Sequence, residues 1–317
     1  MGTQVGISSK LLYTASPATR TLRCLIVGLN QSILSNGDLL RTFISVGPSA
    51  QDGTAQLRIT NAVAVSPDGS SVPFAVRSAT IQIHAGGTSQ GLPSQGVLNA
   101  ASLLFGPVAP GEIVTLLGSM GPGYVSSPEP VLSVNGIKAP ILYAGPNQIN
   151  GIVPFGADPG GPVNLELRSQ GRLVAQVSVP SAAATPAIFT QSQTGVGPGA
   201  ILNQDFTVNS FSNPAAPGSI VMVFGTGFGT LSRVPTDGQI ATEPVTTVIR
   251  VSATIAGLPA EVTYSGSAPT LIAGVIQINV RVPEDAPSNP AAAIILNSGS
   301  AATPAGVTLR LSRVRSE

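Results

Sequence analysis

The sequence has almost none of the residues on which most enzyme sites depend. Its 317 residues include one cysteine, Cys24, and one histidine, His84. A single cysteine cannot form an internal disulfide bond, and one cysteine with one histidine cannot supply the usual ligands of a zinc site. A Ser-His-Asp triad would depend on His84, which ends a predicted strand beside a glycine-rich segment, where an exposed histidine is the ordinary case. We therefore expect no catalytic residue, no metal site and no cofactor, and an inert, buried Cys24 thiol within an apolar strand.

Charged residues are also scarce, and this narrows the choice of partners. Lys and Arg number 15, Asp and Glu number 14, and charged residues make up 9% of the chain, far below the usual quarter or so. The basic residues are scattered singly, so we expect no binding to a nucleic-acid backbone. Arg310, Arg313 and Arg315 are expected to form a solvated tail. No apolar run is long enough for a transmembrane segment, and the first residues lack the pattern of a signal peptide.

The acidic side chains do not indicate an active site either. Paired carboxylates could serve a glycosidase, but most acids lie in predicted turns, where an aspartate bonds its own backbone. These turn residues are Asp38, Asp52, Asp68, Asp158, Asp205, Asp237 and Asp285. Calcium in a surface loop is a weaker alternative, because no dense Asp-x-Asp cluster is present. Tryptophan is absent and tyrosine numbers four, so flat aromatic platforms for sugars are few.

The residues that the sequence does have in abundance are typical of β-structure. Apolar residues make up 43% of the chain, and there are 36 glycines and 28 prolines. Short runs rich in Val, Ile, Thr and Ser alternate with Gly, Pro and Asn turns, a pattern that favours short strands over long helices. We predict an all-β fold made of tandem β-sandwiches.

An internal duplication organises the C-terminal two thirds of the chain. Residues 107–123 and residues 214–229 each contain a Pro-x-Ala-Pro-Gly turn, a short apolar run and a glycine-rich turn. Further on, Gly136 matches Gly257 and Gln148 matches Gln277, so the offset between the copies grows along the chain. The second copy therefore carries insertions near 234–247 and 267–273, which belong in loops. We predict two immunoglobulin-like sandwiches, residues 96–190 and residues 191–317, the second with a short C-terminal tail.

The first copy shows its expected strands most clearly. Asn135-Gly136 and Gln170-Gly171 are turn signals between apolar runs, because glycine and asparagine tolerate the positive φ that tight hairpins need. The predicted strands cover residues 113–117, 131–134, 139–143, 148–154, 163–168 and 173–179.

The N-terminal part resembles the second half of a cohesin domain. The similar segments are residues 35–40, 42–46, 53–59, 68–69 and 76–83, with strands expected at 22–27, 39–46, 56–65 and 72–83. The resemblance implies a truncated jelly-roll sandwich over residues 1–84, of the fold that carbohydrate-binding modules share, followed by a polar linker at 85–95. Cellulosomal cohesins bind dockerin modules. Because the chain begins inside this pattern, we expect that its start is assigned too late or that it is a fragment.

Residues 96–311 resemble the Solibacter-type uncharacterised C-terminal domain family, whose repeats are similar to the IPT/TIG type of immunoglobulin-like fold. The resemblance covers about two thirds of the chain and implies a place near the C-terminus of a large exported bacterial protein. The motifs that carry it are Val97-Leu98-Asn99-Ala100-Ala101-Ser102, Val108-Ala109-Pro110-Gly111, Leu142-Tyr143, Gln148-Ile149-Asn150, Pro186-Ala187-Ile188-Phe189, Ala200-Ile201-Leu202-Asn203-Gln204-Asp205 and Asn213-Pro214-Ala215-Ala216-Pro217-Gly218.

Three further features occur in both copies of the duplication. The glycine-rich loop at residues 225–229 has the wrong spacing for a dinucleotide fingerprint, so we interpret it as a structural turn. Tyr143 and Tyr264 occupy matching positions and are expected to be core or corner tyrosines. The matching amide pairs either face outward or bond neighbouring backbone, and we favour the structural role. These pairs are Gln148 with Asn150 and Gln277 with Asn279.

These observations favour a protein that binds over one that catalyses. The expected function is a non-catalytic surface, adhesion or display role in an exported bacterial protein, located outside the cell or on its surface. The alternative is a carbohydrate-binding or dockerin-binding scaffold module of a polysaccharide-degrading system. A protein or a polysaccharide partner fits either role, and the oligomeric state is left open.

Overall fold

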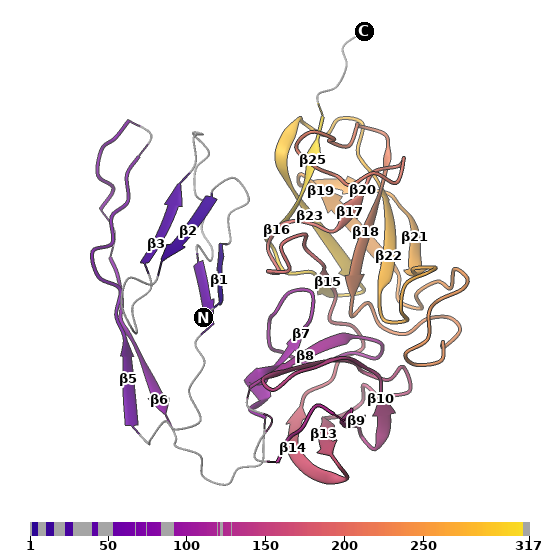
Figure 1. The fold of residues 1–317 in the computed structure, drawn as a ribbon. Helices are drawn as coiled ribbons and strands as arrows, with labels where there is room; N and C mark the ends of the chain where they lie inside the picture. Colours follow the sequence, from indigo (N-terminus) through magenta and orange to yellow (C-terminus); the bar gives the residue numbers. More distant parts are fainter. Residues whose placement is uncertain are drawn as a thin grey trace. The chain divides into compact units, whose positions relative to one another are not determined.

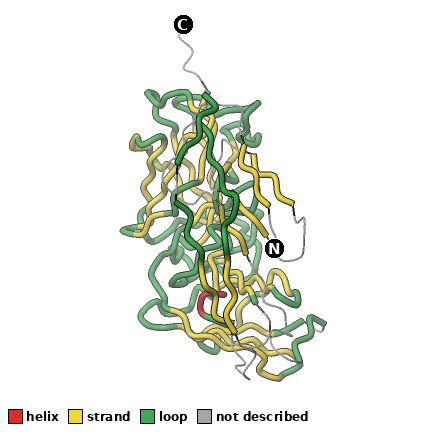
Figure 2. Tube along the Cα trace, turned by 90° about the vertical axis from the view of Figure 1, so that its left-hand side faces the viewer, coloured by secondary structure: helices red, strands yellow, loops and turns green. Residues whose placement is uncertain are grey.

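The computed structural model describes residues 2–5, 11–15, 23–27, 40–43, 53–66, 68–73, 75–83, 92–118, 120, 123–127 and 129–312. Their fold is all-β, as predicted, and consists of tandem sheets that are mainly antiparallel. The single helical element in this part of the chain is the 3₁₀ turn η1 (Ser94–Gly96), which is the short red segment in Figure 2. Among the described residues, no helix has the length and apolar character that crossing a bilayer requires.

The chain divides into two compact units, and the first lies within residues 1–89. Its described residues form three two-stranded sheets (Figure 1). The pairs are β1 (Gly2–Val5) with β4 (Leu40–Phe43), β2 (Leu11–Ala15) with β3 (Arg23–Val27), and β5 (Gly53–Leu57) with β6 (Ala79–Ile83). The predicted turn at 35–38, His84 and residues 85–91 of the predicted linker lie outside the described residues.

Two strands predicted in this unit are shorter in the structure. The strand expected at 56–65 ends with β5 at Leu57, because the backbone turns at Asn61, whose φ is 52°. The strand expected at 72–83 begins at Ala79, and Pro73 in the first part of the expected range has no N–H to give to a ladder. The intervening residues carry exposed apolar side chains, including Ile59 and Val63.

The second unit contains Gln90–Glu317, and its first half is a four-on-four sandwich that we call repeat 1. One sheet contains β10 (Ile137–Ala139), β9 (Val131–Val134), β13 (Val163–Ser169) and β14 (Arg172–Val179), in that order. The other contains β11 (Ile141–Ala144), β12 (Gln148–Ile152), β8 (Ile113–Leu117) and β7 (Val97–Asn99). Side chains alternate between the core and the outside along β13, as expected for a sheet with one buried face.

The second half of this unit, which we call repeat 2, has the same strand order. One sheet contains β15 (Ala187–Ile188), β18 (Ile220–Thr226), β22 (Ile276–Arg281) and β21 (Val262–Ser267), with β17 (Ile201–Leu202) also paired to β18. The other contains β16 (Gly197–Pro198), β25 (Val307–Leu311), β23 (Asn289–Ser298), β19 (Val251–Ile255) and β20 (Leu258–Ala260), with β24 (Ala301–Ala302) paired to β23. The duplication in sequence is therefore a duplication in topology (Figure 1).

The strand predicted at 139–143 is wrong in one respect, because the structure divides it between two sheets. Ala139 pairs with Leu132 in one sheet, whereas Ile141 pairs with Gly151 in the other. Pro140 lies at the crossing and has no N–H for either ladder, but its carbonyl accepts a hydrogen bond from the Ile152 amide. The chain changes sheets at this proline.

Each repeat has its own hydrophobic core, and one side chain crosses between them. Phe155, which follows β12 of repeat 1, is buried in the core of repeat 2. Its backbone amide donates a hydrogen bond to the Asp237 carboxylate of repeat 2, at 3.0 Å. The Ile113 amide donates to Thr226 Oγ1 at 2.8 Å, and that hydroxyl donates to the Gly274 carbonyl. These buried contacts join the two sandwiches.

The two predicted insertions of repeat 2 form loops, and the loops pair with each other. Ile240 in the first insertion bridges to Ile272 in the second. The Ala241 amide also donates to the Leu271 carbonyl, at 2.8 Å. Asp237, the partner of Phe155, belongs to the first of these loops, so the insertions contribute to the junction between the repeats.

Candidate binding site

The glycine-rich stretch at residues 225–229 is a structural turn in the junction, as predicted. β18 ends at Thr226, and Gly227 and Gly229 follow with φ of 78° and 86°. A Cβ atom at Gly227 would lie 2.2 Å from the Thr185 carbonyl oxygen, and one at Gly229 would lie 2.7 Å from the Ala183 carbonyl oxygen. The glycines therefore allow the segment between β14 and β15 to pack closely on the end of repeat 2.

Gly227→Ala is expected to lower the free energy of unfolding by roughly 2 kcal/mol or more, because it combines an unfavourable positive φ with a clash against backbone. Gly136→Ala is the matched control, since Gly136 has a φ of 79° but open space around its Cβ position. That control should lose only about 1 kcal/mol. Urea denaturation of both variants measures the difference, and equal losses would contradict the close packing at Gly227.

The matching tyrosines do not lie in the core. Tyr143 on β11 is 52% exposed, and Tyr264 on β21 is half-buried. Each ring lies against the glycine two residues later, Gly145 or Gly266, which has no side chain to obstruct it. The Tyr264 hydroxyl donates to the Ser267 carbonyl at 2.6 Å. Tyr264 therefore fits the corner alternative of the prediction, and for Tyr143 the core alternative is wrong.

The repeated amides bond each other rather than neighbouring backbone. Gln148 Nε2 donates to Asn150 Oδ1 at 2.9 Å, and Gln277 Nε2 donates to Asn279 Oδ1 at 2.8 Å. Both pairs are half-buried on the strand face opposite the core, because the intervening isoleucine is fully buried in each repeat. Asn150 is also the register partner of Tyr143 across β11 and β12.

Three of the predicted turn aspartates bond their own turns, whereas Asp38 and Asp52 lie outside the described residues. Asp68 Oδ1 accepts from Ser70 N at 3.0 Å, Asp158 Oδ1 accepts from Gly160 N at 2.8 Å, and Asp205 Oδ1 accepts from Thr207 N at 3.1 Å. Asp237 instead accepts a hydrogen bond from the Phe155 amide across the junction. Among the residues that the structure describes, no group of three or more His, Cys, Asp or Glu side chains could hold a metal ion.

The single cysteine is less buried than predicted. Cys24 in β3 is only partly covered, and this partial burial raises the pKa of its thiol. The raised pKa makes the thiolate scarcer at neutral pH, which agrees with an inert thiol.

One buried ionisable residue was not identified from the sequence. Glu112 is fully buried at the start of β8, and its Oε2 accepts from the Ala109 amide at 2.7 Å and the Thr185 hydroxyl at 2.6 Å. Its Oε1 has no hydrogen-bond partner among the described residues. Burial raises the pKa of this carboxyl to about 7, and the hydrogen bond from Thr185 opposes the shift.

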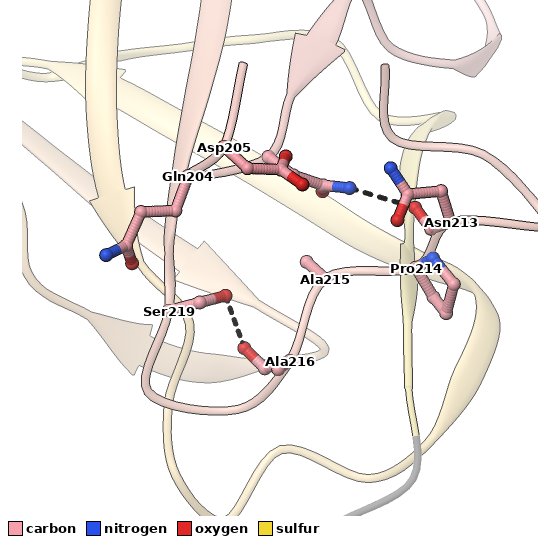
Figure 3. A pocket seen from close by; sticks show the side chains of 8 residues that line it. Gln204, Asp205, Asn213, Pro214, Ala215, Ala216 and Ser219 are labelled. Atoms are coloured by element: carbon pink, nitrogen blue, oxygen red, sulfur yellow. Dashed lines mark hydrogen bonds between the residues drawn. The ribbon is translucent and has the colours of Figure 1, made fainter. Parts of the chain in front are cut away.

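An open pocket lies in repeat 2. It has a volume of about 450 Å³, and Figure 3 shows its lining. Asn203 Nδ2 donates to the Asn213 carbonyl at 3.0 Å, and Ser219 Oγ donates to the Ala216 carbonyl at 2.6 Å. The lining residues are Asn203, Gln204, Asp205, Asn213, Pro214, Ala215, Ala216 and Ser219. Two of the sequence motifs that resemble the Solibacter-type family thus meet at one place.

Exposed phenylalanines lie on the two chain segments that border this pocket. Phe206 directly follows Asp205 and is 75% exposed, and Phe211 precedes Asn213 and is 81% exposed. Phe206 also has a φ of 65°, which is an outlier for a bulky residue. Arg310 lies over the Phe211 ring, 5.9 Å from its centroid. Two exposed aromatic rings therefore lie on the segments that border the open pocket.

Phe206→Gly is expected to raise the free energy of unfolding by about 0.5–1 kcal/mol. Glycine removes the steric cost of the positive φ, and this gain exceeds the entropic cost that glycine adds by making the unfolded chain more flexible. Phe211→Gly is the control, since Phe211 is equally exposed but lies outside the left-handed region. It should not gain stability. Urea denaturation compares the two variants, and a loss of stability in Phe206→Gly would show that the ring supports the fold itself.

A scan against models of protein families finds none that matches the chain, and a search of curated proteins finds no match. The cohesin-like, immunoglobulin-like and Solibacter-type resemblances therefore stay predictions.

Proposed function

We propose that the chain is a non-catalytic binding module of an exported bacterial protein that acts in adhesion or display at the cell surface. The observation that carries the proposal is the strained, exposed Phe206 beside the open pocket of repeat 2. The buried junction joins repeat 2 to repeat 1, so this surface is presented on a firm support. The resemblance to the Solibacter-type family supplies the expected exported setting.

The location is tested in cells that make the protein from its own gene. Antibodies against the second unit should detect it in the surface or secreted fraction, and brief protease treatment of intact cells should remove it. Detection of the protein only inside the cell, where protease cannot reach it, would overturn the proposal. An abundant cytoplasmic protein serves as the control for cell lysis.

Carbohydrate binding is a second candidate, and one observation favours it. Tyr143 is exposed, and in the strand register it is opposite Asn150, whose amide pairs with Gln148. An aromatic face beside amide groups suits a sugar ring. Glycan-array binding that Tyr143→Ala removes and Phe105→Ala preserves would support this function. Phe105 is 66% exposed and provides the matched loss of an aromatic side chain.

A further inference from the structure

Two consecutive residues of repeat 1, Glu112 and Ile113, take part in the contact with repeat 2. Glu112 Oε2 accepts from the Thr185 hydroxyl at 2.6 Å, and the Ile113 amide donates to Thr226 Oγ1 at 2.8 Å. Thr185 is itself joined to repeat 2, because its amide donates to the Gly227 carbonyl at 2.7 Å. An ionisable side chain is therefore built into the contact between the two sandwiches.

Both repeats contribute to the cover over this carboxyl. Asn99 Nδ2 of repeat 1 donates to the Thr185 carbonyl at 3.0 Å. Gly227 of repeat 2 packs on the same carbonyl so closely that a Cβ atom there would lie 2.2 Å from the oxygen. Glu112 is fully buried beneath Thr185. Movement of Thr185 away from repeat 1 removes this cover and lets water reach the carboxyl.

The surroundings suit the neutral form of the Glu112 side chain better than the ionised form. Oε2 accepts two hydrogen bonds, from the Ala109 amide and the Thr185 hydroxyl, whereas Oε1 has no partner among the described residues. An ionised carboxylate has about four acceptor positions and needs a cation or further donors when it is buried. A neutral acid leaves one polar group unpaired, which costs far less than an unpaired buried charge.

The packed segments supply no compensating charge. Those that contact Glu112 or Thr185 contain no other ionisable side chain, and they are residues 97–105, 107–111, 151–157, 180–190 and 225–229. Among the described residues, the one further acid that hydrogen-bonds any of these segments is Asp237, at the Phe155 amide. Burial accordingly raises the pKa of Glu112 to about 7, and only hydrogen bonds oppose the shift.

We propose that the contact between the repeats is a proton-dependent latch, which is closed while Glu112 is protonated and opens locally when Glu112 gives its proton to the solvent. In the open form Thr185 and Thr226 leave Glu112 and Ile113. Both repeats stay folded, and Phe155 stays in the core of repeat 2 as the pivot. The latch depends neither on the binding role nor on the cellular location proposed above.

The two protonation equilibria give the sign and the size of the effect. Below the ordinary pKa of 4.5, the carboxyl is protonated in both forms, so pH does not change the population of the open form. Between 4.5 and about 7 the solvated carboxyl of the open form loses its proton while the closed form keeps it, so opening becomes more favourable as the pH rises. Above the folded pKa the opening constant levels off, after a total increase of roughly 300-fold.

Hydrogen exchange of the Ile113 amide, followed by NMR on the full chain, measures this opening, because the amide must leave Thr226 before it exchanges. Glu112→Gln is the reference at each pH, since it keeps a neutral side chain of similar shape and cancels the intrinsic pH dependence of exchange. The wild-type rate should exceed the Glu112→Gln rate by less than about tenfold at pH 5 and by about 100-fold or more at pH 8. A ratio that is the same at pH 5 and pH 8 overturns the proposal.

The Leu165 amide separates local opening from global unfolding. Leu165 is buried on β13, which is paired on both edges within repeat 1. At pH 8 the Ile113 amide should exchange at least about ten times faster than the Leu165 amide. Equal rates at the two amides would mean that Glu112 meets water only when the whole unit unfolds, and they would also overturn the proposal.

Thr185→Val tests the latch without changing Glu112. Valine keeps the shape of threonine but cannot donate to Glu112 Oε2. In a variant that folds normally by circular dichroism, the Ile113 amide should exchange about 5–10 times faster than in the wild type at pH 5, because the closed form has lost one hydrogen bond. An unchanged rate would show that Thr185 does not hold the contact closed, contrary to the proposal.

Discussion

Raising the pH from 5 to 8 is expected to lower the free energy of unfolding by about 3 kcal/mol through Glu112 alone. Burial raises its pKa to about 7 in the folded chain, against an ordinary value of 4.5. Between these two values the folded chain keeps a proton that the unfolded chain has lost, so stability falls as the pH rises and levels off above the folded pKa. Each unit of pKa difference corresponds to about 1.36 kcal/mol, which sets the expected size.

Glu112→Gln should abolish this fall. The amide oxygen can still accept from the Ala109 amide and the Thr185 hydroxyl, which Glu112 Oε2 contacts at 2.7 and 2.6 Å, but the side chain no longer ionises. Urea denaturation at pH 5, 6, 7 and 8 measures the profile for both proteins. Glu129→Gln is the control, because Glu129 is exposed, and its profile should follow the wild type. Parallel profiles for the wild type and Glu112→Gln would show that Glu112 does not carry the effect.

Phe155→Ala is expected to cost about 3–5 kcal/mol of stability, as for other buried phenylalanines. The larger consequence concerns how cooperatively the two repeats unfold. Phe155 follows a strand of repeat 1 but lies in the core of repeat 2, so its loss removes an apolar link between the two repeats. We expect the single unfolding transition of the tandem to become broader or to separate into two.

Calorimetry tests this through the ratio of the calorimetric to the van't Hoff enthalpy, which should rise above that of the wild type. Phe105→Ala removes an equally large ring that is 66% exposed, and it should change stability by no more than about 0.5 kcal/mol. A Phe155→Ala protein that stays within about 1 kcal/mol of the wild type would mean that hydrogen bonds such as Ile113 to Thr226 hold the junction without the ring.

Strands with strong local signals could be predicted from the sequence. The strands expected at 113–117 and 131–134 are β8 and β9, residue for residue. Asn135 and Gly136 have the positive φ values that their turn signal predicts, 49° and 79°. Local pattern succeeds here because apolar runs and turn residues agree with the final fold.

The division at Pro140 and the junction could not be predicted in the same way. A proline between two apolar runs is compatible with an edge strand as well as with a change of sheet, and the tertiary pairing decides between them. Glu112 looks like an ordinary acid in a turn, and its partner Thr185 lies 73 residues away. Such contacts depend on how two repeats meet, which local patterning does not encode.

The candidate site was only partly predictable from the sequence. Its two walls lie in motifs singled out for the Solibacter-type resemblance, but nothing in those motifs shows that Asn203 and Ser219 line one pocket. Phe206 is distinguished by its exposure and by its φ of 65°, which are properties of the folded backbone and not of the sequence pattern.

The bond between Ile113 and Thr226 also has a consequence for the time course of synthesis. The Thr226 hydroxyl that accepts the Ile113 amide donates in turn to the Gly274 carbonyl, so this end of repeat 1 is completed only after residue 274 has left the ribosome. At a synthesis rate of roughly 5–20 residues per second, the gap from residue 113 corresponds to roughly ten to thirty seconds. During that interval the end of repeat 1 remains open to the repeat 2 of a neighbouring nascent chain. Exchange of repeats between chains is therefore the misassembly that competes with correct folding of this architecture.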